Sequence, residues 1–589
     1  MKKKLLLLPI LATSFLAITS CSPNDDHHGS DTPIDDYDPD DTDFDDVTPT
    51  TGDFSITTSV ENGYTVSNNI YTITLAGTYT LSGALDGQVV VDTSSGKVIL
   101  ELNNTSITYD QNSPILASKN NDKVTINVLE NTKNTITDNR ATKTVDDDNM
   151  GEGALSAKAD MEIKGSGTLV VTGNYNNGVH TSKDLKIGDV SLKSTAYNNA
   201  IKGNKSVSIS SGNIFAISTH GDGIETKDTD TSSKGKQRGD ITITGGTVNV
   251  YAAGDGLQCA HSFYMQDDDN EDTALPILYV ETGAYSEYTA SDASTTSYKG
   301  VKVEDELTIS AGKIVLHTYD DGLHADYGTA FDNGYTGVGK ININGGQVVA
   351  EVNTPTKDSG GSGWRRPPGS GDGDPWGGQQ EVKGADGIHA DNMVTVNDGQ
   401  IKIDSAFEGI EANHIVFNGG TTKIYSTDDG LNGSQKINEE ATIVFNGGFV
   451  DIDAVGDDVD GIDCNGDITM AGGVVVTKGN SSGPSTCFDI DDAFTMTGGT
   501  LVLIGNREAK SCSFSNVYQL SFSSSLAKGD WKLKIDGDIE FSLLFTGQAP
   551  LVYSSAITNG NSYILTNGTT DYQATAKAAT SFASGGGRP

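Results

Sequence analysis

The residues from Tyr319 to Gly328 read YDDGLHADYG. Asp followed by Gly is common in turns, because Asp hydrogen-bonds to nearby backbone and Gly adopts positive φ angles. Variants of this turn recur along the chain, so it marks an internal repeat. Aligned on the apolar residue, the turns are EGALSA at Leu155, NNGVHT at Val179, NNAIKG at Ile201, GDGIET at Ile224, GDGLQC at Leu257, YKGVKV at Val301, DDGLHA at Leu323, ADGIHA at Ile388, FEGIEA at Ile410, DDGLNG at Leu431 and VDGIDC at Ile462.

The shortest intervals between these turns are 24, 22, 23, 22, 22 and 21 residues. Two longer intervals contain inserts, near residues 260–275 and 352–384. Between turns the chain alternates apolar and polar residues around a glycine turn, as in NHIVFNGGTTKIYS at residues 413–426. Such alternation is typical of half-buried strands. Each repeat therefore predicts about three short strands and no helix.

A repeat of this length with three strands predicts an all-β fold, a right-handed parallel β-helix over residues 54–510. Propeller blades are about twice as long, and the leucine-rich repeat consensus is absent. After residue 510 the acidic turn disappears but the alternation continues. Residues 511–578 are therefore expected to form a β-rich cap that protects the last coil, followed by a flexible tail at 579–589.

The formal charge of −41 excludes the common modes of nucleic-acid binding, which need clusters of Lys and Arg. Such acidity suits divalent cations and neutral partners. A polyanion could approach only through bridging cations.

The N-terminus resembles a bacterial lipoprotein signal over residues 1–21. Lys2 to Lys4 precede an apolar run from Leu5 to Ile18, which is too short to span a bilayer, and small residues lead to Cys21. This predicts lipidation of Cys21 and export to the outer membrane or cell surface, with membrane contact through the lipid anchor only. Residues 22–53 are rich in Asp and Pro, which predicts an acidic, disordered tether.

Four further cysteines are present, at Cys259, Cys464, Cys487 and Cys512. An exported protein can form disulfides, and four cysteines leave three pairings open. Cys259 and Cys464 fall at the inward position after the turn, which favours buried free thiols over reactive ones.

Stacking of the coils would place equivalent turn residues about 4.8 Å apart. The residues that precede the turn glycines would then form a column, and most of them carry carboxylates. Neighbouring carboxylates at that spacing repel by about 0.8 kcal/mol in water and about 3 kcal/mol at an effective dielectric of 20. Calcium would turn this repulsion into binding sites, because it takes six to eight oxygen ligands. Protonation, solvent screening and a purely structural role for the turn remain alternatives.

These turns, together with the segment ITLAGTYTLSGALDGQVVVDTSSGKVILELNNTSIT at residues 73–108, resemble the carbohydrate-binding parallel β-helix family of exported bacterial proteins, which is related to polysaccharide lyases. The resemblance implies binding of plant cell-wall polysaccharides such as cellulose or pectin, with calcium as the cofactor. Lys299 departs from an all-acidic column, so one continuous row of metal ions is not expected. The metal role falls on Asp222, Asp255, Asp321, Asp386, Glu408, Asp429 and Asp460.

Polysaccharide binding is the favoured function. The expected contact residues combine aromatic rings with outward histidines: Tyr319, His324, Trp364, Trp376 and His389. A calcium-dependent, pectate-type lyase is an alternative and would need Lys202 or Lys302 as its base, although dense carboxylates oppose the deprotonation of a lysine. A non-catalytic surface adhesin or scaffold is the third possibility. Partnership with other surface glycan-uptake proteins is a further expectation.

Overall fold

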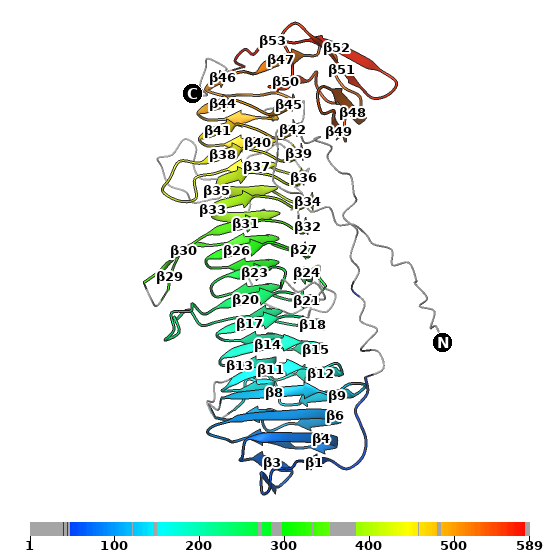
Figure 1. Ribbon diagram of the computed structural model, residues 1–589, viewed down its shortest axis with the longest axis vertical. Coiled ribbons are helices and arrows are strands. Elements are labelled where there is room, and N and C mark those ends of the chain that lie inside the picture. Colours follow the sequence, from blue (N-terminus) through cyan, green and yellow to red (C-terminus); the bar gives the residue numbers. More distant parts are fainter. Residues whose placement is uncertain are drawn as a thin grey trace, which may run out of the picture.

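Short strands follow one another around a coil, and successive coils stack along one axis (Figure 1). The computed structural model describes residues 39, 44, 47–119, 122–144, 150–268, 274–283, 297–331, 334–353, 384–456, 459–479 and 485–582. Cys21, Trp364 and Trp376 lie outside the described residues, as does most of the predicted tether. Within the described residues no helix is both long and apolar enough to cross a bilayer.

The repeated turn leads into the first of three parallel ladders. Its register pairs the apolar turn residues with one another, for example Leu323 with Ile388 and Ile388 with Ile410. The strands of this ladder are β5 (Gln88–Val91), β7 (Ile115–Ala117), β10 (Gly153–Ala157), β13 (Asn177–Thr181), β16 (Ile201–Gly203), β19 (Ile224–Glu225), β22 (Leu257–Cys259), β25 (Val301–Val303), β28 (Leu323–Ala325), β33 (Ile388–Val396), β35 (Ile410–Phe417), β37 (Leu431–Gly433), β40 (Ile462–Cys464) and β43 (Asp489–Ile490).

The second ladder follows after a short corner. In two coils the corner is extended, so β33 and β35 each contribute to both ladders. The part of the predicted 260–275 insert that reads FYM is β23 of this ladder, since its apolar residues alternate inward. Besides β33 and β35, the strands of this ladder are β8 (Lys123–Val128), β11 (Asp160–Lys164), β14 (Asp184–Gly188), β17 (Ser206–Ile209), β20 (Asp240–Ile243), β23 (Phe263–Met265), β26 (Glu306–Ile309), β31 (Lys340–Ile343), β38 (Thr442–Phe445), β41 (Asp467–Met470), β44 (Ala493–Met496) and β46 (Ser511–Phe514).

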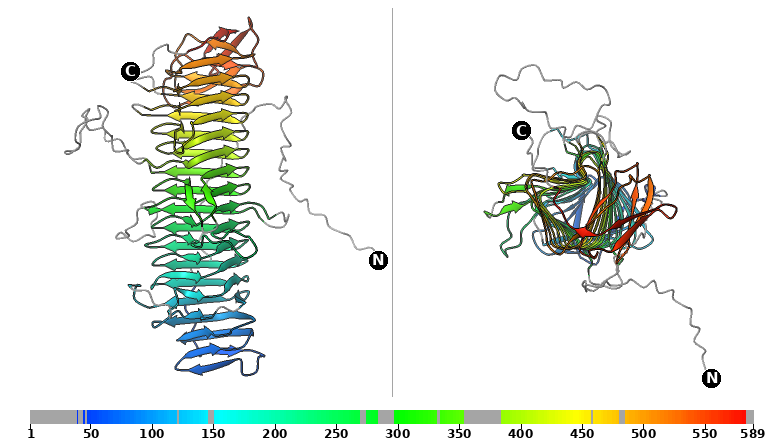
Figure 2. Two further views of the ribbon diagram at one scale, coloured as in Figure 1. Left: turned by 90° about the vertical axis from the view of Figure 1, so that its left-hand side faces the viewer. Right: turned by 90° about the horizontal axis from the view of Figure 1, so that it is seen from above.

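The third ladder begins after the glycine turn and leads back to the next repeated turn. Its strands are β9 (Lys133–Asp138), β12 (Thr168–Gly173), β15 (Ser191–Ala196), β18 (Asn213–Ser218), β21 (Thr247–Ala252), β24 (Ile277–Thr282), β27 (Lys313–Thr318), β32 (Gln347–Val352), β34 (Gln400–Ser405), β36 (Thr421–Ser426), β39 (Phe449–Ala454), β42 (Val474–Lys478) and β45 (Thr500–Ile504). Seen along the stack, the coils superpose around one central core (Figure 2).

The core is made of columns of apolar side chains. All eleven apolar turn residues, from Leu155 to Ile462, are fully buried. Phe417 and Phe445, from neighbouring coils, stack with ring centroids 5.4 Å apart. The four cysteines are free thiols: Cys259, Cys464 and Cys487 are buried, and Cys512 is half-buried.

The turn between the second and third ladders explains the repeated pair of glycines. The second glycine has a positive φ, as at Gly448 (81°), and a Cβ there would lie 2.6 Å from the Gly419 carbonyl oxygen of the coil before it. The asparagine before the pair is stacked as well. Asn446 Nδ2 donates to Asn418 Oδ1 at 2.8 Å, and Asn418 Nδ2 donates to Asn397 Oδ1 at 2.8 Å.

The parallel ladders end in an antiparallel cap. β45 pairs with β50 (Leu551–Ser554), and β50 pairs with β47 (Tyr518–Ser521). Beside them lies the sheet β49 (Ile539–Leu543), β48 (Gly529–Lys534), β51 (Ser562–Thr566) and β52 (Asp571–Thr575). The buried Lys478 ties the cap to the coils, since its Nζ lies 2.6 Å from Asp451 and 3.1 Å from the Ser542 carbonyl oxygen. The predicted parallel β-helix with a β-rich C-terminal cap is confirmed.

The first coil is closed by a hairpin of β2 (Tyr64–Ser67) and β3 (Ile70–Ile73), and by β1 (Ser55–Thr57) against β4 (Gly77–Asp86). The long β6 (Lys97–Tyr109) follows, and a second hairpin of β29 (Tyr327–Ala330) and β30 (Thr336–Val338) projects from the side. One tether residue, Phe44, packs on the outer face of β18, with its ring 5.5 Å from that of Phe215.

Candidate metal and carbohydrate site

The residue before the turn glycine has a structural task in most coils. Its Oδ1 atom accepts the backbone N–H of the equivalent residue in the next coil: Asp222 from Asp255 at 2.9 Å, and Asp429 from Asp460 at 2.7 Å. Asp321 and Asp460 do the same, accepting from Asp386 at 2.9 Å and from Thr486 at 2.6 Å. Each turn is thus capped by the coil before it.

This capping does not require a charge. In the N-terminal coils Asn177 and Asn199 occupy the same position, and Asn199 Oδ1 accepts the backbone N–H of Asp222 at 2.9 Å. An amide oxygen therefore serves as well as a carboxylate. Capping explains one oxygen of each aspartate, but it explains neither the second oxygen nor the negative charge.

The negative charges of the column disfavour one another. Burial, with the charges of Asp255 and Glu225, raises the pKa of Asp222 to about 7. Burial raises the pKa of Asp386 to about 7 as well, and the charge of Asp321 adds to the effect. The ionised column is therefore unfavourable unless protons or cations neutralise it.

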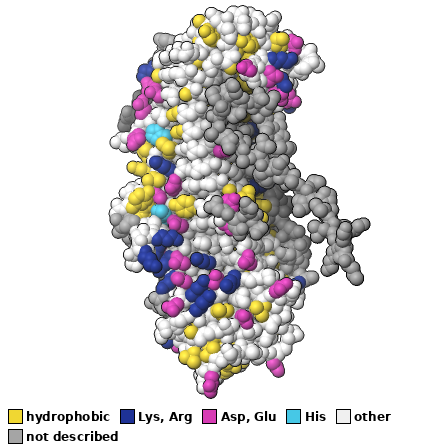
Figure 3. Space-filling view, in the orientation of Figure 1, with side chains coloured by type: hydrophobic (Ala, Val, Ile, Leu, Met, Phe, Trp, Pro, Cys, Tyr) yellow, Lys and Arg dark blue, Asp and Glu magenta, His cyan; other side chains and the backbone are white. Residues whose placement is uncertain are grey.

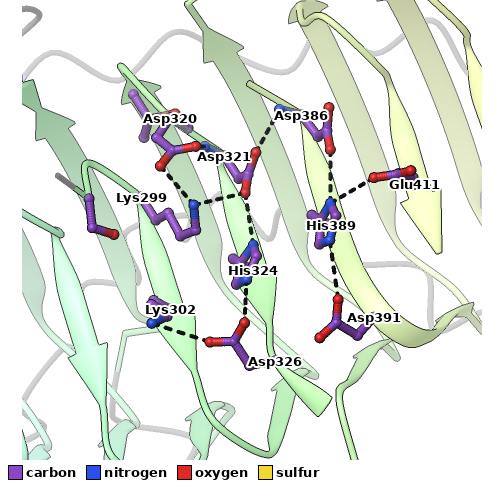
Figure 4. Close-up of polar contacts among 12 residues, drawn as sticks. Lys299, Lys302, Asp320, Asp321, His324, Asp326, Asp386, His389, Asp391 and Glu411 are labelled. Carbon is purple, nitrogen blue, oxygen red and sulfur yellow. Dashed lines mark hydrogen bonds and ion pairs between the residues drawn. The ribbon is translucent and has the colours of Figure 1, made fainter. Parts of the chain in front are cut away.

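The two strands that begin within DGLHAD and DGIHAD, β28 and β33, place their histidines side by side (Figure 4). The rings of His324 and His389 stack with centroids 4.8 Å apart and planes inclined by 10°. His324 lies between Asp321, 2.8 Å from Nδ1, and Asp326, 2.9 Å from Nε2. Both nitrogens of the His324 ring are therefore engaged by carboxylates.

His389 is enclosed in the same way and has one more acidic neighbour. Its Nδ1 lies 2.9 Å from Asp386 Oδ2 and 3.0 Å from Glu411 Oε2. Burial lowers the pKa of His389, but the hydrogen bonds to Asp386, Asp391 and Glu411 outweigh it and hold the pKa well above its usual value. The ring is therefore a buried cation among carboxylates.

Two parallel rings do not converge on one metal ion, because their lone pairs point in the same direction rather than toward a common centre. The donor sets around them also contain nitrogen, which calcium does not favour. These are Asp321, His324 and His389, and Asp386, His389 and Glu411, with ligand atoms within 4.8 Å of one another. The histidine pair is therefore better explained as two stacked rings that are ion-paired to carboxylates than as a calcium site.

An all-carboxylate cluster lies farther along the turn face, which is the side of the coils that carries the repeated turns. Asp460, Asp463 and Asp489 offer ligand oxygens within 4.8 Å of one another. Burial and the charges of Asp460 and Asp489 raise the pKa of Asp463 to about 7. Hard oxygen ligands with excess negative charge are the donor set that calcium prefers.

A second position shows oxygens that have no donor. Asn432 Nδ2 donates to Glu408 Oε1 at 3.0 Å. Glu408 Oε2 and Asn432 Oδ1 are buried, and neither has a hydrogen-bonding partner among the described residues. Burial and the charges of Asp386 and Glu411 hold the pKa of Glu408 well above its usual range. A cation bound at this point would compensate both oxygens.

Lysines supply the positive charge in the coils that interrupt the acidic column. Lys299 Nζ lies 2.7 Å from Asp320 and 3.1 Å from Asp321. Lys302 pairs with Asp326 at 3.2 Å, and Lys436 pairs with Glu411 at 2.7 Å. These ammonium groups neutralise carboxylates that would otherwise need a cation.

The predicted contact residues are only partly brought together. Tyr319 is 42% exposed and meets Tyr298 edge to face at 5.5 Å. His324 and His389 are largely enclosed, so they present little ring surface to a sugar. Trp364 and Trp376 lie outside the described residues.

Of the predicted metal residues, Asp460 joins the all-carboxylate cluster, and Asp321 and Asp386 join the histidine clusters. Glu408 provides the oxygen without a donor. Asp222, Asp255 and Asp429 act in coil-to-coil capping.

Sequence reasoning missed Asp489. Its coil reads STCFDIDD and lacks the Gly of the turn, so the repeat pattern stops one coil early. The register nevertheless pairs Asp489 with Asp463. The only signal was the apolar, acidic, apolar order of Phe488, Asp489 and Ile490.

The family model and the curated relative that match this chain carry the same description. The model of the family described as carbohydrate-binding domain-containing protein matches residues 67–354, 339–430 and 376–584. A carbohydrate-binding domain-containing protein from Acetivibrio thermocellus is 36% identical over 137 residues, which are 22% of this chain and 48% of that protein. The chain thus spans about half the length of this curated relative.

A solved structure, titled as the gadolinium derivative of the polysaccharide lyase-like protein from C. thermocellum, is 30% identical. The match covers 42% of this chain and 90% of that one, with a TM-score of 0.34.

Proposed function

Because the chain belongs to the family of carbohydrate-binding domain-containing proteins, we propose that it is a calcium-binding surface lipoprotein that binds polysaccharide along its turn face. The proposed ligands are plant cell-wall glycans such as cellulose or pectin. The proposed anchor is a lipid on Cys21, which would hold the protein at the outer membrane or cell surface, where glycan-uptake proteins would be its neighbours.

One observation supports calcium above all others. The turn column has more negative charge than its capping role uses, and it includes buried oxygens without a donor at Glu408 and Asn432. Calcium would supply the missing positive charge and accept those oxygens as ligands. Asp460, Asp463 and Asp489 would hold a second ion through carboxylates alone.

Calcium also connects the acidic surface to a polysaccharide. A pectin-like chain is itself negatively charged, so it would be repelled by a protein of net charge −41. Ions held along the stacked turns would bridge carboxylates of the protein and of the glycan. The two proposed ions would lie on the same side of the coils, since both positions belong to the ladder of stacked turns.

Binding is favoured over cleavage by the state of the lysines. A base that removes a proton must itself be unprotonated. Lys302 is held between Asp326 and Glu304. Burial lowers its pKa, but the carboxylates of Asp326, Glu304 and Asp255 together outweigh burial and raise it. Lys202 pairs with Glu225. Neither ammonium group is prepared to act as a base.

The test is calorimetric titration of the calcium-free full-length protein with calcium, with thermal unfolding followed in parallel. We expect saturable binding and a higher Tm. The double variant Asp463→Asn with Asp489→Asn should lose part of the binding and of the rise in Tm. Asp189→Asn removes a charge at an exposed position and should change neither.

Pectin and cellulose binding is then measured with and without calcium. Calcium-dependent retention on either glycan supports the whole proposal. Absence of heat, of stabilisation and of glycan retention would reject it. Glycan retention that ignores calcium would leave polysaccharide binding and remove the metal. Attachment to cells without glycan binding would favour the scaffold alternative.

A further inference from the structure

A pocket on the turn face, near the N-terminal coils, is lined by lysines and amides rather than by the carboxylates of the acidic column. It has a volume of about 370 Å³ and lies over β13, β16 and the residues after β19. Its walls include Lys143, Asn176, His180, Lys202, Asn204 and Lys227. Lys and Arg side chains also gather over the neighbouring strands β14 and β17 in Figure 3.

The change of character follows from the repeat itself. At the position before the turn glycine these coils carry Asn177 and Asn199, where later coils carry aspartates. At the outward position His180 pairs in register with Lys202. The same ladder therefore presents amides and an ammonium group here, and carboxylates farther along.

The pocket lysines are held in different ways. Lys143 Nζ lies 2.7 Å from Glu152 Oε2, which also accepts from Asn176 Nδ2 at 2.7 Å. Lys202 pairs with Glu225. Lys227 is exposed and makes no ion pair with any residue that the structure describes. Its charge acts on the neighbouring Asp228 but is not neutralised by direct contact with a carboxylate, unlike the charges of Lys143 and Lys202.

Two buried polar atoms in the pocket are poorly satisfied. His180 Nδ1 and Asn204 Oδ1 are buried and form no hydrogen bond of good geometry with described residues, although the two side chains lie close enough for Asn204 to act on the pKa of His180. The His180 side chain is only about a tenth exposed, and burial together with the charge of Lys202 lowers its pKa to about 4. The ring is therefore neutral at physiological pH. Poorly satisfied buried polar atoms are unfavourable, so a ligand that offers them a better donor and acceptor would be stabilised here.

We propose that this pocket binds one carboxylate-bearing sugar residue of an acidic polysaccharide directly, without calcium. The sugar carboxylate lies against Lys227 and Lys202. The sugar hydroxyls bond to the neutral imidazole of His180 and to the amide of Asn204. This proposal rests on the proposed function, because it names a site and a sugar class for the same polysaccharide. It differs in needing no metal.

The test uses the full-length protein in excess EDTA and trigalacturonate as the probe. We expect trigalacturonate to bind by calorimetry, and the affinity to fall as salt is added, because charges are involved. Lys227→Gln should weaken binding about tenfold, the effect of one charge-assisted hydrogen bond. Lys186→Gln, an exposed lysine on the adjacent β14, should leave affinity unchanged. Lys227 is exposed, so the variant should fold, and its Tm confirms this.

Asn204→Ala is the second variant and should weaken trigalacturonate binding without altering the salt dependence. Cellotriose, which has the hydroxyls but no carboxylate, should bind at least tenfold more weakly than trigalacturonate. Equal binding of inorganic sulfate would overturn the proposal, because it would show a simple anion site.

Failure of this proposal is distinguishable from failure of the proposed function. If trigalacturonate binds only after calcium is restored, the pocket proposal is overturned and calcium-dependent glycan binding stands. Equal loss in Lys186→Gln and Lys227→Gln would also overturn it, since a general electrostatic effect would then explain the affinity.

Discussion

Each aspartate of the turn has two oxygens with different roles. Oδ1 accepts the backbone N–H of the next coil, as Asp429 does from Asp460 at 2.7 Å. The other oxygen and the charge are surplus to that role, since Asn199 caps Asp222 without a charge. Capping and cation binding can therefore be separated by single substitutions.

Asp429 is the residue at which to separate them. Burial and the charges of Asp463 and Asp428 hold its pKa well above the usual range. In EDTA, Asp429→Asn should raise the stability, because it removes a buried carboxyl that is unfavourable to ionise and keeps the Oδ1 cap. Asp429→Ala should lower it by about 1–3 kcal/mol by leaving the Asp460 N–H unpaired. Thermal unfolding measures both.

Asn199→Ala is the comparison variant, since it removes the same cap made by a neutral side chain, together with the Nδ2 hydrogen bond to Glu225. It should destabilise the protein at least as much as Asp429→Ala. If Asp429→Asn destabilised the calcium-free protein as much as Asp429→Ala, the carboxylate itself would be needed for capping, and the surplus charge would need no cation.

The positions of these residues were predictable because the repeat fixes the register. The columns through Asp321, Asp386 and Glu408 follow directly from aligning the turns. The enclosure of the histidines was not predictable. It depends on Asp326 and Asp391, two residues farther on, whose direction is set by how the chain leaves the coil.

At the scale of the element, the glycine turn between the second and third ladders is fixed by two independent constraints. Gly447 has no room for a side chain, because a Cβ would lie 2.4 Å from the Asn418 carbonyl oxygen. Gly448 has a φ of 81° and is also close to the coil before it. The asparagine ladder from Asn397 to Asn446 holds the same turns in line.

Gly448→Ala should therefore destabilise the protein more than the same substitution at a glycine that has only the backbone constraint. Gly560 is the control, with a φ of 86° and open space around its Cβ position. Gly560→Ala should lower stability by about 1–2 kcal/mol through backbone strain. Gly448→Ala should lower Tm further, since it adds a contact with the Gly419 carbonyl oxygen. Equal shifts would show that the stacked coils move apart readily.

Element types were easier to predict than element boundaries. Three strands per coil follow from the alternation. The strand Phe263–Met265 was read as part of an insert, because its acidic continuation outweighed three residues of alternation. The two long strands β33 and β35, which join two ladders, carry no separate signal in the sequence.

At the scale of the whole molecule, the turn column begins with the amides of Asn177 and Asn199 and continues mainly with carboxylates, which Lys299 interrupts. The family and the fold class were predictable because the chemistry repeats. The opposite charges of the two regions appear only when the coils are stacked. Because of the acidic region, the stability of the protein depends on pH.

Between pH 6.5 and 8 the calcium-free protein should lose stability as pH rises. The raised pKa values of Asp222, Asp386 and Asp463, about 7 each, mean that the folded state holds protons that the unfolded state has already released. Stability therefore falls as these carboxyls ionise. His180, with its lowered pKa, acts mainly below this range. His261 adds to the fall within it, because hydrogen bonds to Asp240 and Asp305 raise its pKa to about 9 against the effect of burial.

With saturating calcium the part of this fall that is due to Asp463 should disappear, because a bound ion keeps that carboxylate ionised and compensated. The parts due to Asp222 and Asp386 should remain, since neither lies at a proposed calcium position. Tm measured at pH 6.5, 7.25 and 8, with EDTA or calcium, tests this. A Tm that rises with pH in EDTA would contradict the raised pKa values.

The Oδ1 caps of the turns run one way, from the side chain of one coil to the backbone of the next. Each coil therefore offers acceptors to the coil that follows it in the sequence, and among the described turns a bond in the other direction is seen at Asn177, whose Nδ2 donates to the Glu152 carbonyl oxygen at 2.9 Å. A chain that emerges N-terminus first can add its coils in the order in which they appear. The antiparallel cap, synthesised last, then stops further growth, so assembly of the molecule has a start, a direction and an end.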